Sequence, residues 1–96
     1  MNLTNSNTKL KEETFSLEEL VGTYHLILYN DDYNTFDWVI ECLIDLCEHS
    51  SEQAEQCALL VHFKGKCQIK NGSYNTLKPI CDAMLERGLS AKVEAP

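Results

Sequence analysis

Residues 24–36 decide the fold, and they read YHLILYNDDYNTF. The first six are aromatic or aliphatic apart from His25, which is a composition typical of a β-strand. The polar run at residues 30–32 ends this segment abruptly, because Asn and Asp favour turns. The stretch therefore predicts a strand over residues 24–29 that leads directly into a polar loop.

A helix is expected directly after this loop. Its buried face is predicted by apolar side chains that recur at helical spacing: Phe36, Val39, Ile40, Leu43 and Cys47. Acidic residues at positions 37, 41 and 45 fall on the remaining surface. We expect Asn34 to cap the amino end of this helix by accepting a hydrogen bond from a first-turn N–H.

A second helix and a second strand follow. Ser50 and Gln53 form a capping-box pattern at the start of a helix that Gly65 ends. Residues 66–70 have the composition of a strand, and Asn71-Gly72 is a turn signal after it.

The last helix and strand complete the domain. The apolar stripe of this helix consists of Leu77, Ile80, Cys81, Met84 and Leu85, and Gly88 stops it. Residues 89–93 alternate between apolar and polar side chains, as a short final strand does. The element order is thus β-α-α-β-α-β, for which the economical packing is a small sheet with helices on one side.

Composition limits the classes of function. A length of 96 residues fits one domain. The net charge of −7 argues against nucleic acid as the main partner, since Lys and Arg contacts to phosphates dominate that affinity. No apolar run approaches the roughly 20 residues of a membrane span, and no apolar signal segment begins the chain. We therefore expect a cytoplasmic protein without nucleic-acid or membrane partners.

Residues 1–22 differ in composition from the rest. Asn, Thr, Ser, Lys and Glu dominate them, and the only apolar cluster lies at positions 15, 17, 20 and 21. Such low hydrophobicity seldom offsets the entropy that is lost on ordering. We predict a flexible amino-terminal extension over residues 1–22 and a core domain over residues 23–96.

Five cysteines, at positions 42, 47, 57, 67 and 81, raise the question of disulfides or a metal. Their odd number and the lack of an export signal favour buried thiols that act as small apolar side chains. A metal site would combine four of them with two histidines, but no C-x-x-C occurs and the spacings match no common zinc pattern. These ligands would be Cys42, Cys47, His49, Cys57, His62 and Cys67. We expect structural cysteines and no metal, with a small metal-binding regulator as the less favoured alternative.

The polar residues 30–34 allow three interpretations. A turn with a helix cap is the simplest. A calcium loop is the second, because oxygen-bearing side chains fall at EF-hand offsets from Asn30 to Glu41, but Thr35 stands where that loop needs Gly. An acid–base pair is the third, although adjacent carboxylates of an extended segment point apart and no nucleophile accompanies them. His62 in isolation is a helix-terminal cation or a satisfied polar group.

Two motifs together resemble those of a known family. Residues 29–39, YNDDYNTFDWV, resemble the N-D-D-Y-T-P-M-x-F-V signature of the ClpS family. Residues 61–67, VHFKGKC, resemble its V-H-x-x-G-K-A motif, and the distance between the two motifs fits. The resemblance covers about residues 24–94. It implies an α+β fold in which a small three-stranded antiparallel sheet packs against three helices, similar to a ribosomal stalk domain.

The resemblance also implies a function. ClpS proteins are adaptors that bind substrates with a bulky hydrophobic amino-terminal residue, an N-degron. They hand these substrates to the N-terminal domain of a Clp AAA+ unfoldase, which feeds the ClpP peptidase, and they have neither catalytic activity nor a cofactor. Carried over position by position, Asn30, Asp32 and His62 would bind the substrate α-ammonium, whose three N–H donors need acceptors. Asp31 would support the loop.

The hydrophobic pocket of the family maps onto seven positions of this chain: Leu28, Asn34, Phe36, Val39, Ala58, Val61 and Leu89. The family usually has Thr, Met and Met where this chain has Asn34, Phe36 and Ala58, and it has Pro where this chain has Thr35. Because Met is a flexible gap-filler, rigid Phe and small Ala move volume from one wall to the other. We expect an altered preference among bulky first residues. The alternatives are compensated packing of the core and an interaction module whose pocket Phe36 closes.

Overall fold

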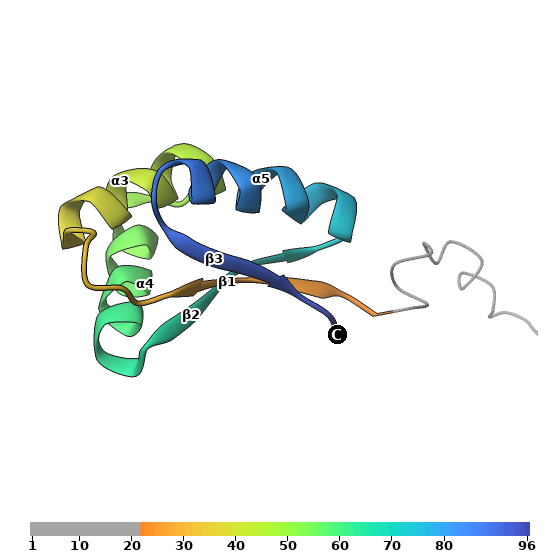
Figure 1. The fold of residues 1–96 in the computed structure, drawn as a ribbon, viewed down its shortest axis with the longest axis horizontal. Coiled ribbons are helices and arrows are strands. Elements are labelled where there is room, and N and C mark those ends of the chain that lie inside the picture. The colour runs from red at the N-terminus through yellow and green to blue at the C-terminus, as the bar shows by residue number, and fades with distance from the viewer. Residues whose placement is uncertain (1–21) are drawn as a thin grey trace, which may run out of the picture.

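The structure is a computed structural model that describes residues 22–96 (Figure 1). Six elements follow one another in that range: β1 (Tyr24–Tyr29), α3 (Phe36–Cys47), α4 (Ser51–Lys64), β2 (Lys66–Gly72), α5 (Tyr74–Glu86) and β3 (Ser90–Glu94). This order and the α+β class are those predicted from the sequence. The predicted amino-terminal extension, residues 1–22, lies outside the described residues except for Gly22.

The three strands form one antiparallel sheet in the order β2-β1-β3. β1 takes the central place because it is apolar along its middle, where residues 26–28 are all buried. Its last residue, Tyr29, pairs with Lys66 at the start of β2 and with Ser90 at the start of β3. The carboxyl end of β1 therefore lies beside the first residue of both neighbouring strands.

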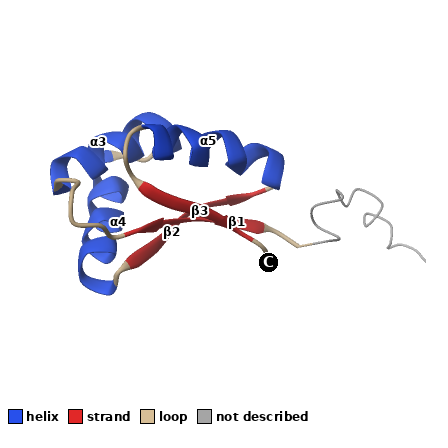
Figure 2. Ribbon diagram, in the orientation of Figure 1, coloured by secondary structure: helices blue, strands red, loops and turns tan. Residues whose placement is uncertain are grey.

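The core lies between the sheet and the helices. In the view of Figure 2, α3 and α5 lie above the sheet, and α4 runs beside its end toward β2. No charged or polar residue is buried among those the structure describes. None of the described helices combines the length and apolar character that a membrane crossing needs. The largest fully buried side chains are Leu26, Leu28, Cys42, Leu43, Leu77 and Met84.

The residue that caps α3 differs from the prediction. Thr35, not Asn34, occupies the N-cap position, and its Oγ1 accepts a hydrogen bond from the Trp38 N–H at 3.1 Å. Asn34 lies one residue before this position, where its N–H and its side-chain Nδ2 both donate to the carboxylate of Asp31. The expected capping group is thus held in the loop, and the next residue with a side-chain oxygen takes its role.

Two boundaries were predicted correctly and three details were wrong. The capping box of Ser50 and Gln53 is present, and Gly65 ends α4 with a φ of 93°, a left-handed conformation that favours glycine. Asn71 and Gly72 lie in β2 and not in a turn, because β1 begins at Tyr24 and gives both of them a pairing partner. Leu85 belongs to the predicted apolar stripe of the last helix, but it is 50% exposed. Leu89 belongs to the predicted final strand, but it precedes β3.

The assigned core predicts how α3 contributes to stability. Leu43→Ala deletes a fully buried side chain, so we expect the free energy of unfolding to fall by about 2–5 kcal/mol. Ile44→Ala is the matched control, because the neighbouring Ile44 is 38% exposed and loses less apolar contact. Urea unfolding followed by circular dichroism measures both variants. Equal losses would contradict the assigned core.

Candidate functional site

The two motifs singled out in the sequence lie next to each other in space. The loop after β1 begins at Asn30, whose N–H donates to the carbonyl of Gly65 at 2.9 Å. Gly65 ends α4 and immediately precedes β2, which pairs with β1. His62 is therefore three residues from the backbone contact that fixes Asn30. Sheet pairing places the loop and the last turn of α4 on one side of the domain.

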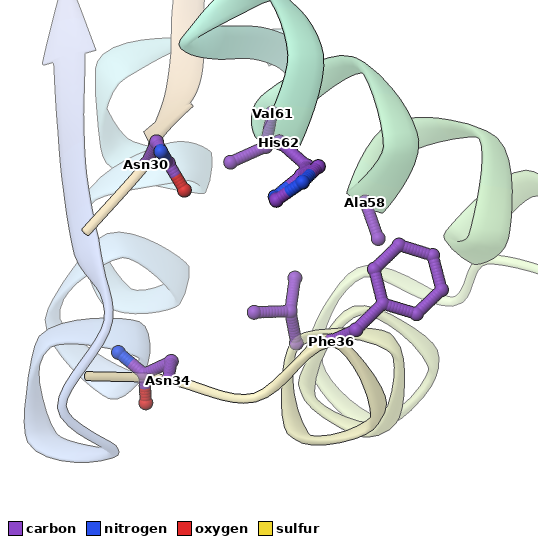
Figure 3. Close-up of a pocket in the computed structure, with 7 residues that line it drawn as sticks. Asn30, Asn34, Phe36, Ala58, Val61 and His62 are labelled. Carbon is purple, nitrogen blue, oxygen red and sulfur yellow. The ribbon is translucent and has the colours of Figure 1, made fainter. Parts of the chain in front are cut away.

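A hollow opens between these two segments and α3. It holds about 300 Å³ of empty space, part of it open to solvent. Figure 3 shows the side chains of Asn30 and His62 pointing into this space from opposite sides. Neither forms a hydrogen bond with another residue of the range 22–96. The residues that line the hollow are Asn30, Asn34, Phe36, Val39, Ala58, Val61 and His62.

Asn30 and His62 form the polar rim of this hollow, and the wall below them is apolar. Val39, Ala58 and Val61 are each at most 9% exposed. Phe36 is 38% exposed, and its ring reaches from the start of α3 toward the short side chain of Ala58 (Figure 3). The large residue on α3 thus stands opposite the small one on α4.

A deeper space adjoins this wall. It holds about 220 Å³ and is lined by Leu28, Leu89 and parts of the loop after β1. Leu28 is buried in β1, and Leu89 is buried just before β3. The structure therefore brings all seven predicted pocket residues to one region, two of them at its floor.

Asp31 holds the loop in its turn. Its Oδ1 accepts the N–H groups of Tyr33 and Asn34, each at 2.8 Å, and its Oδ2 accepts Asn34 Nδ2 at 2.7 Å. Partial burial alone would raise the pKa of the Asp31 carboxyl, but the hydrogen bonds from Asn34 and Tyr33 outweigh it and hold the pKa below its ordinary value. These bonds therefore stabilise the fold above the ordinary aspartate range, and the contribution is lost as pH falls through the lowered pKa.

Asp32 lies outside the hollow, at its mouth. The mouth is a wider space of about 890 Å³, lined by Asp32 together with residues of the loop and of α4. Asp32 is exposed. It adds negative charge near Asn30 and His62 without forming part of the apolar wall.

Two residues at the mouth were not predicted as part of the site. Leu59 and Phe63 line it from α4, and Phe63 is 74% exposed. The ring of Phe63 meets that of His62 edge-on, with centroids 4.7 Å apart. Their signal in the sequence is the spacing of four residues beside His62, which places Leu59 and Phe63 on one face of the helix.

The cysteines have the environment of core residues. All five are free, and only Cys57 is more than marginally accessible. Burial raises the pKa of Cys47 to about 11, and burial together with contact to Cys57 raises that of Cys67 to about 12. Within residues 22–96, no three His, Cys, Asp or Glu side chains are placed to share a metal ion.

The arrangement favours one kind of ligand. Hydrogen-bond acceptors and negative charge surround the rim, and apolar side chains form the wall and floor. A group with several N–H donors and a bulky apolar substituent matches both parts at once.

Comparison with known proteins identifies one family by sequence. The family described as "ATP-dependent Clp protease adaptor protein ClpS" matches residues 21–92. The ClpS adapter protein of Acetivibrio thermocellus is 41% identical over 59 residues, which are 62% of this chain and 60% of that protein. That of Vibrio cholerae is 46% identical over 43 residues, or 45% of this chain and 41% of that protein. The chain thus spans between two fifths and three fifths of the length of these curated relatives.

A solved structure shares the fold. Agrobacterium tumefaciens ClpS2, bound to L-phenylalaninamide, superposes with a TM-score of 0.68 at 21% identity, covering 79% of this chain and 99% of that one. At this identity the likeness shows the fold alone. The family match, however, extends over far more than half of the sequence and includes both motifs of the hollow. This chain belongs to the ClpS family of Clp protease adaptor proteins.

Proposed function

We propose that this protein binds the free amino terminus of proteins whose first residue is bulky and hydrophobic. The observation that carries the proposal is the hollow in which the side chains of Asn30 and His62, neither of them hydrogen-bonded to another described residue, face each other above an apolar wall. The ligand named for the solved ClpS2, L-phenylalaninamide, has a free amine beside an aromatic side chain. That chemistry matches the rim and the wall of this hollow.

The ammonium of a chain terminus needs several acceptors, because it carries three donors and no acceptor of its own. Asn30 Oδ1 and the neutral nitrogen of His62 supply two. The Asp32 carboxylate at the mouth supplies the third, directly or through a water molecule. The carboxylate of Asp31 is committed to the loop and acts by shaping it.

The expected affinity follows from these contacts. Hydrogen bonds to a charged group contribute about 1.5–3 kcal/mol each. Burying the first side chain against Val39, Ala58 and Val61 contributes roughly 1.5–3 kcal/mol more. After the cost of association, a total near −8 kcal/mol, which corresponds to about 1 μM, is within reach of this site.

Binding of an amino terminus would serve to deliver the bound protein for degradation. As a ClpS adaptor, the protein would pass its substrate to the N-terminal domain of a Clp AAA+ unfoldase, which feeds the ClpP peptidase. The adaptor itself would carry out no catalysis and need no cofactor, and it would work in the cytoplasm. Residues 1–22, which precede β1, are the segment that would engage the unfoldase during delivery.

One observation favours a second candidate. The ring of Phe36 lines the hollow and reaches toward Ala58. An interaction module whose pocket is closed by Phe36 would keep the fold but not bind amino termini. A measurement of peptide binding distinguishes this module from an adaptor that binds amino termini.

The proposed function predicts a strict need for the free amine. A labelled peptide that begins with Leu or Phe should bind, and its acetylated twin should bind at least about a hundredfold more weakly, because acetylation removes the charge and two or more charge-assisted hydrogen bonds. Fluorescence anisotropy measures both, with a Gly-started peptide as the control for the first side chain. Equal affinities of the twins would contradict the proposal, and no binding of either would support the closed module.

The proposed role of His62 predicts that removal of its ring weakens binding. His62→Ala should bind a Leu-started peptide about tenfold more weakly, because the ammonium loses one hydrogen-bond acceptor. His25→Ala is the matched control, since His25 bonds to Asn71 at the far end of β1. Fluorescence anisotropy measures both variants, and an unchanged affinity in His62→Ala would exclude the acceptor role.

The pocket wall predicts that removal of the Phe36 ring changes the preference for the first residue of a bound peptide. Phe36→Ala should raise the affinity for a Trp-started peptide relative to a Leu-started one by about threefold or more, because the larger side chain fills the space that the ring leaves. Tyr74→Ala removes an aromatic ring that is 45% exposed at the start of α5, away from these spaces, and serves as the control. Four peptides that differ only in the first residue, Leu, Phe, Tyr or Trp, give the ranking. An unchanged ratio in Phe36→Ala would show that this ring does not shape the pocket.

A further inference from the structure

The side chain of Asn34 connects two segments that are distant in the sequence. Its Nδ2 donates to Asp31 Oδ2 at 2.7 Å and to the carbonyl oxygen of Gly88 at 2.8 Å. Asp31 belongs to the loop after β1, whereas Gly88 belongs to the turn between α5 and β3. One amide group therefore ties the loop that carries Asn30 to the turn between α5 and β3.

That turn is also attached to α3. The indole Nε1 of Trp38 donates to the carbonyl of Arg87 at 3.1 Å, and the Arg87 guanidinium pairs with Asp45 at 3.1 Å. The chain then passes through Gly88, whose φ of 88° lies in the left-handed region that favours glycine. Leu89 follows and is buried at the floor of the site. Its N–H donates to the carbonyl of Met84 at 3.0 Å, so Leu89 belongs to the same turn that Asn34 contacts.

We propose that Asn34 is a positioning residue for the recognition of amino termini. It holds the loop with Asn30 and the turn before Leu89 in one arrangement, so that the rim and the floor are preorganised for the first residue of a bound chain. Groups that are already ordered do not have to be ordered on binding, which raises affinity. This inference rests on the proposed function and adds a residue that acts through its neighbours.

The surroundings of Asn34 separate this role from a role in stability. Its contact with Gly88 is exposed, and its contact with Asp31 is only partly buried. Water can therefore satisfy both acceptors when the amide is removed. Loss of the amide should loosen the site while the core, which lies elsewhere, keeps the domain folded.

The test compares two variants of Asn34 with two of another asparagine. Asn34→Asp keeps the shape but replaces both donors by an acceptor beside Asp31, and Asn34→Ala removes them without adding charge. We expect each to bind a Leu-started peptide at least about tenfold more weakly. Asn75→Asp and Asn75→Ala are the matched controls, because Asn75 is exposed in the first turn of α5, at the opposite end from Gly88. Both should bind within about twofold of the unmodified protein. If Asn34→Asp fails to fold, Asn34→Ala carries the test.

A second readout follows the turn directly. Trp38 is the single tryptophan, and its indole N–H reports on Arg87, the neighbour of Gly88. In the free protein, the NMR signals of the Trp38 indole N–H and the Leu89 backbone N–H should shift in the Asn34 variants and stay in place in the Asn75 variants.

Each outcome decides between the proposals. If the unmodified protein binds and Asn34→Ala binds within twofold of it, the positioning role is overturned and the proposed function stands. Weaker binding with unmoved Trp38 and Leu89 signals also overturns it, because Asn34 would then act by direct contact. If the unmodified protein binds no peptide with a free amine, the proposed function fails and this inference fails with it.

Discussion

The hydrogen bond from the Asn30 N–H to the carbonyl of Gly65 is the contact on which the site depends. It lies one step beyond the pairing of Tyr29 with Lys66, so the sheet itself extends into the site. Main-chain bonding, and not side-chain contact, sets the distance between the loop and the end of α4. The side chains of Asn30 and His62 are consequently not needed for this contact and point into the hollow, on segments that a rigid frame holds in place.

The order of the elements could be predicted because each segment has a local signal. The apolar run of β1, the capping box at Ser50 and the glycine at position 65 all act within a few residues. Two of the errors arose where another contact prevailed over a local preference. Asn34 is a good cap by composition, but Asp31 and Gly88 engage its amide. Asn71-Gly72 is a good turn by composition, but β1 offers it a pairing partner.

The residues of the candidate site, like the order of the elements, could be predicted in part from the sequence. Two motifs at the right separation were enough to group Asn30 with His62, although nothing in the spacing alone places them across one hollow. The role of Gly88 could not be predicted, because it contributes a main-chain carbonyl that any residue carries. Phe63 was missed for another reason: its spacing of four residues from Leu59 places both on one face of α4, but that spacing does not show that this face borders the hollow.

The opposition of Phe36 and Ala58 has a consequence for how such a protein can diverge. A bulky residue at position 58 would meet the ring of Phe36, and a small residue at position 36 would leave empty space beside Ala58. A sequence that carries only one of these changes would therefore be overpacked or would contain a cavity at this place. We therefore expect epistasis between positions 36 and 58. Evolution from a large residue at 36 and a small one at 58 to the reverse should pass first through a side chain of intermediate size and high flexibility at one of them.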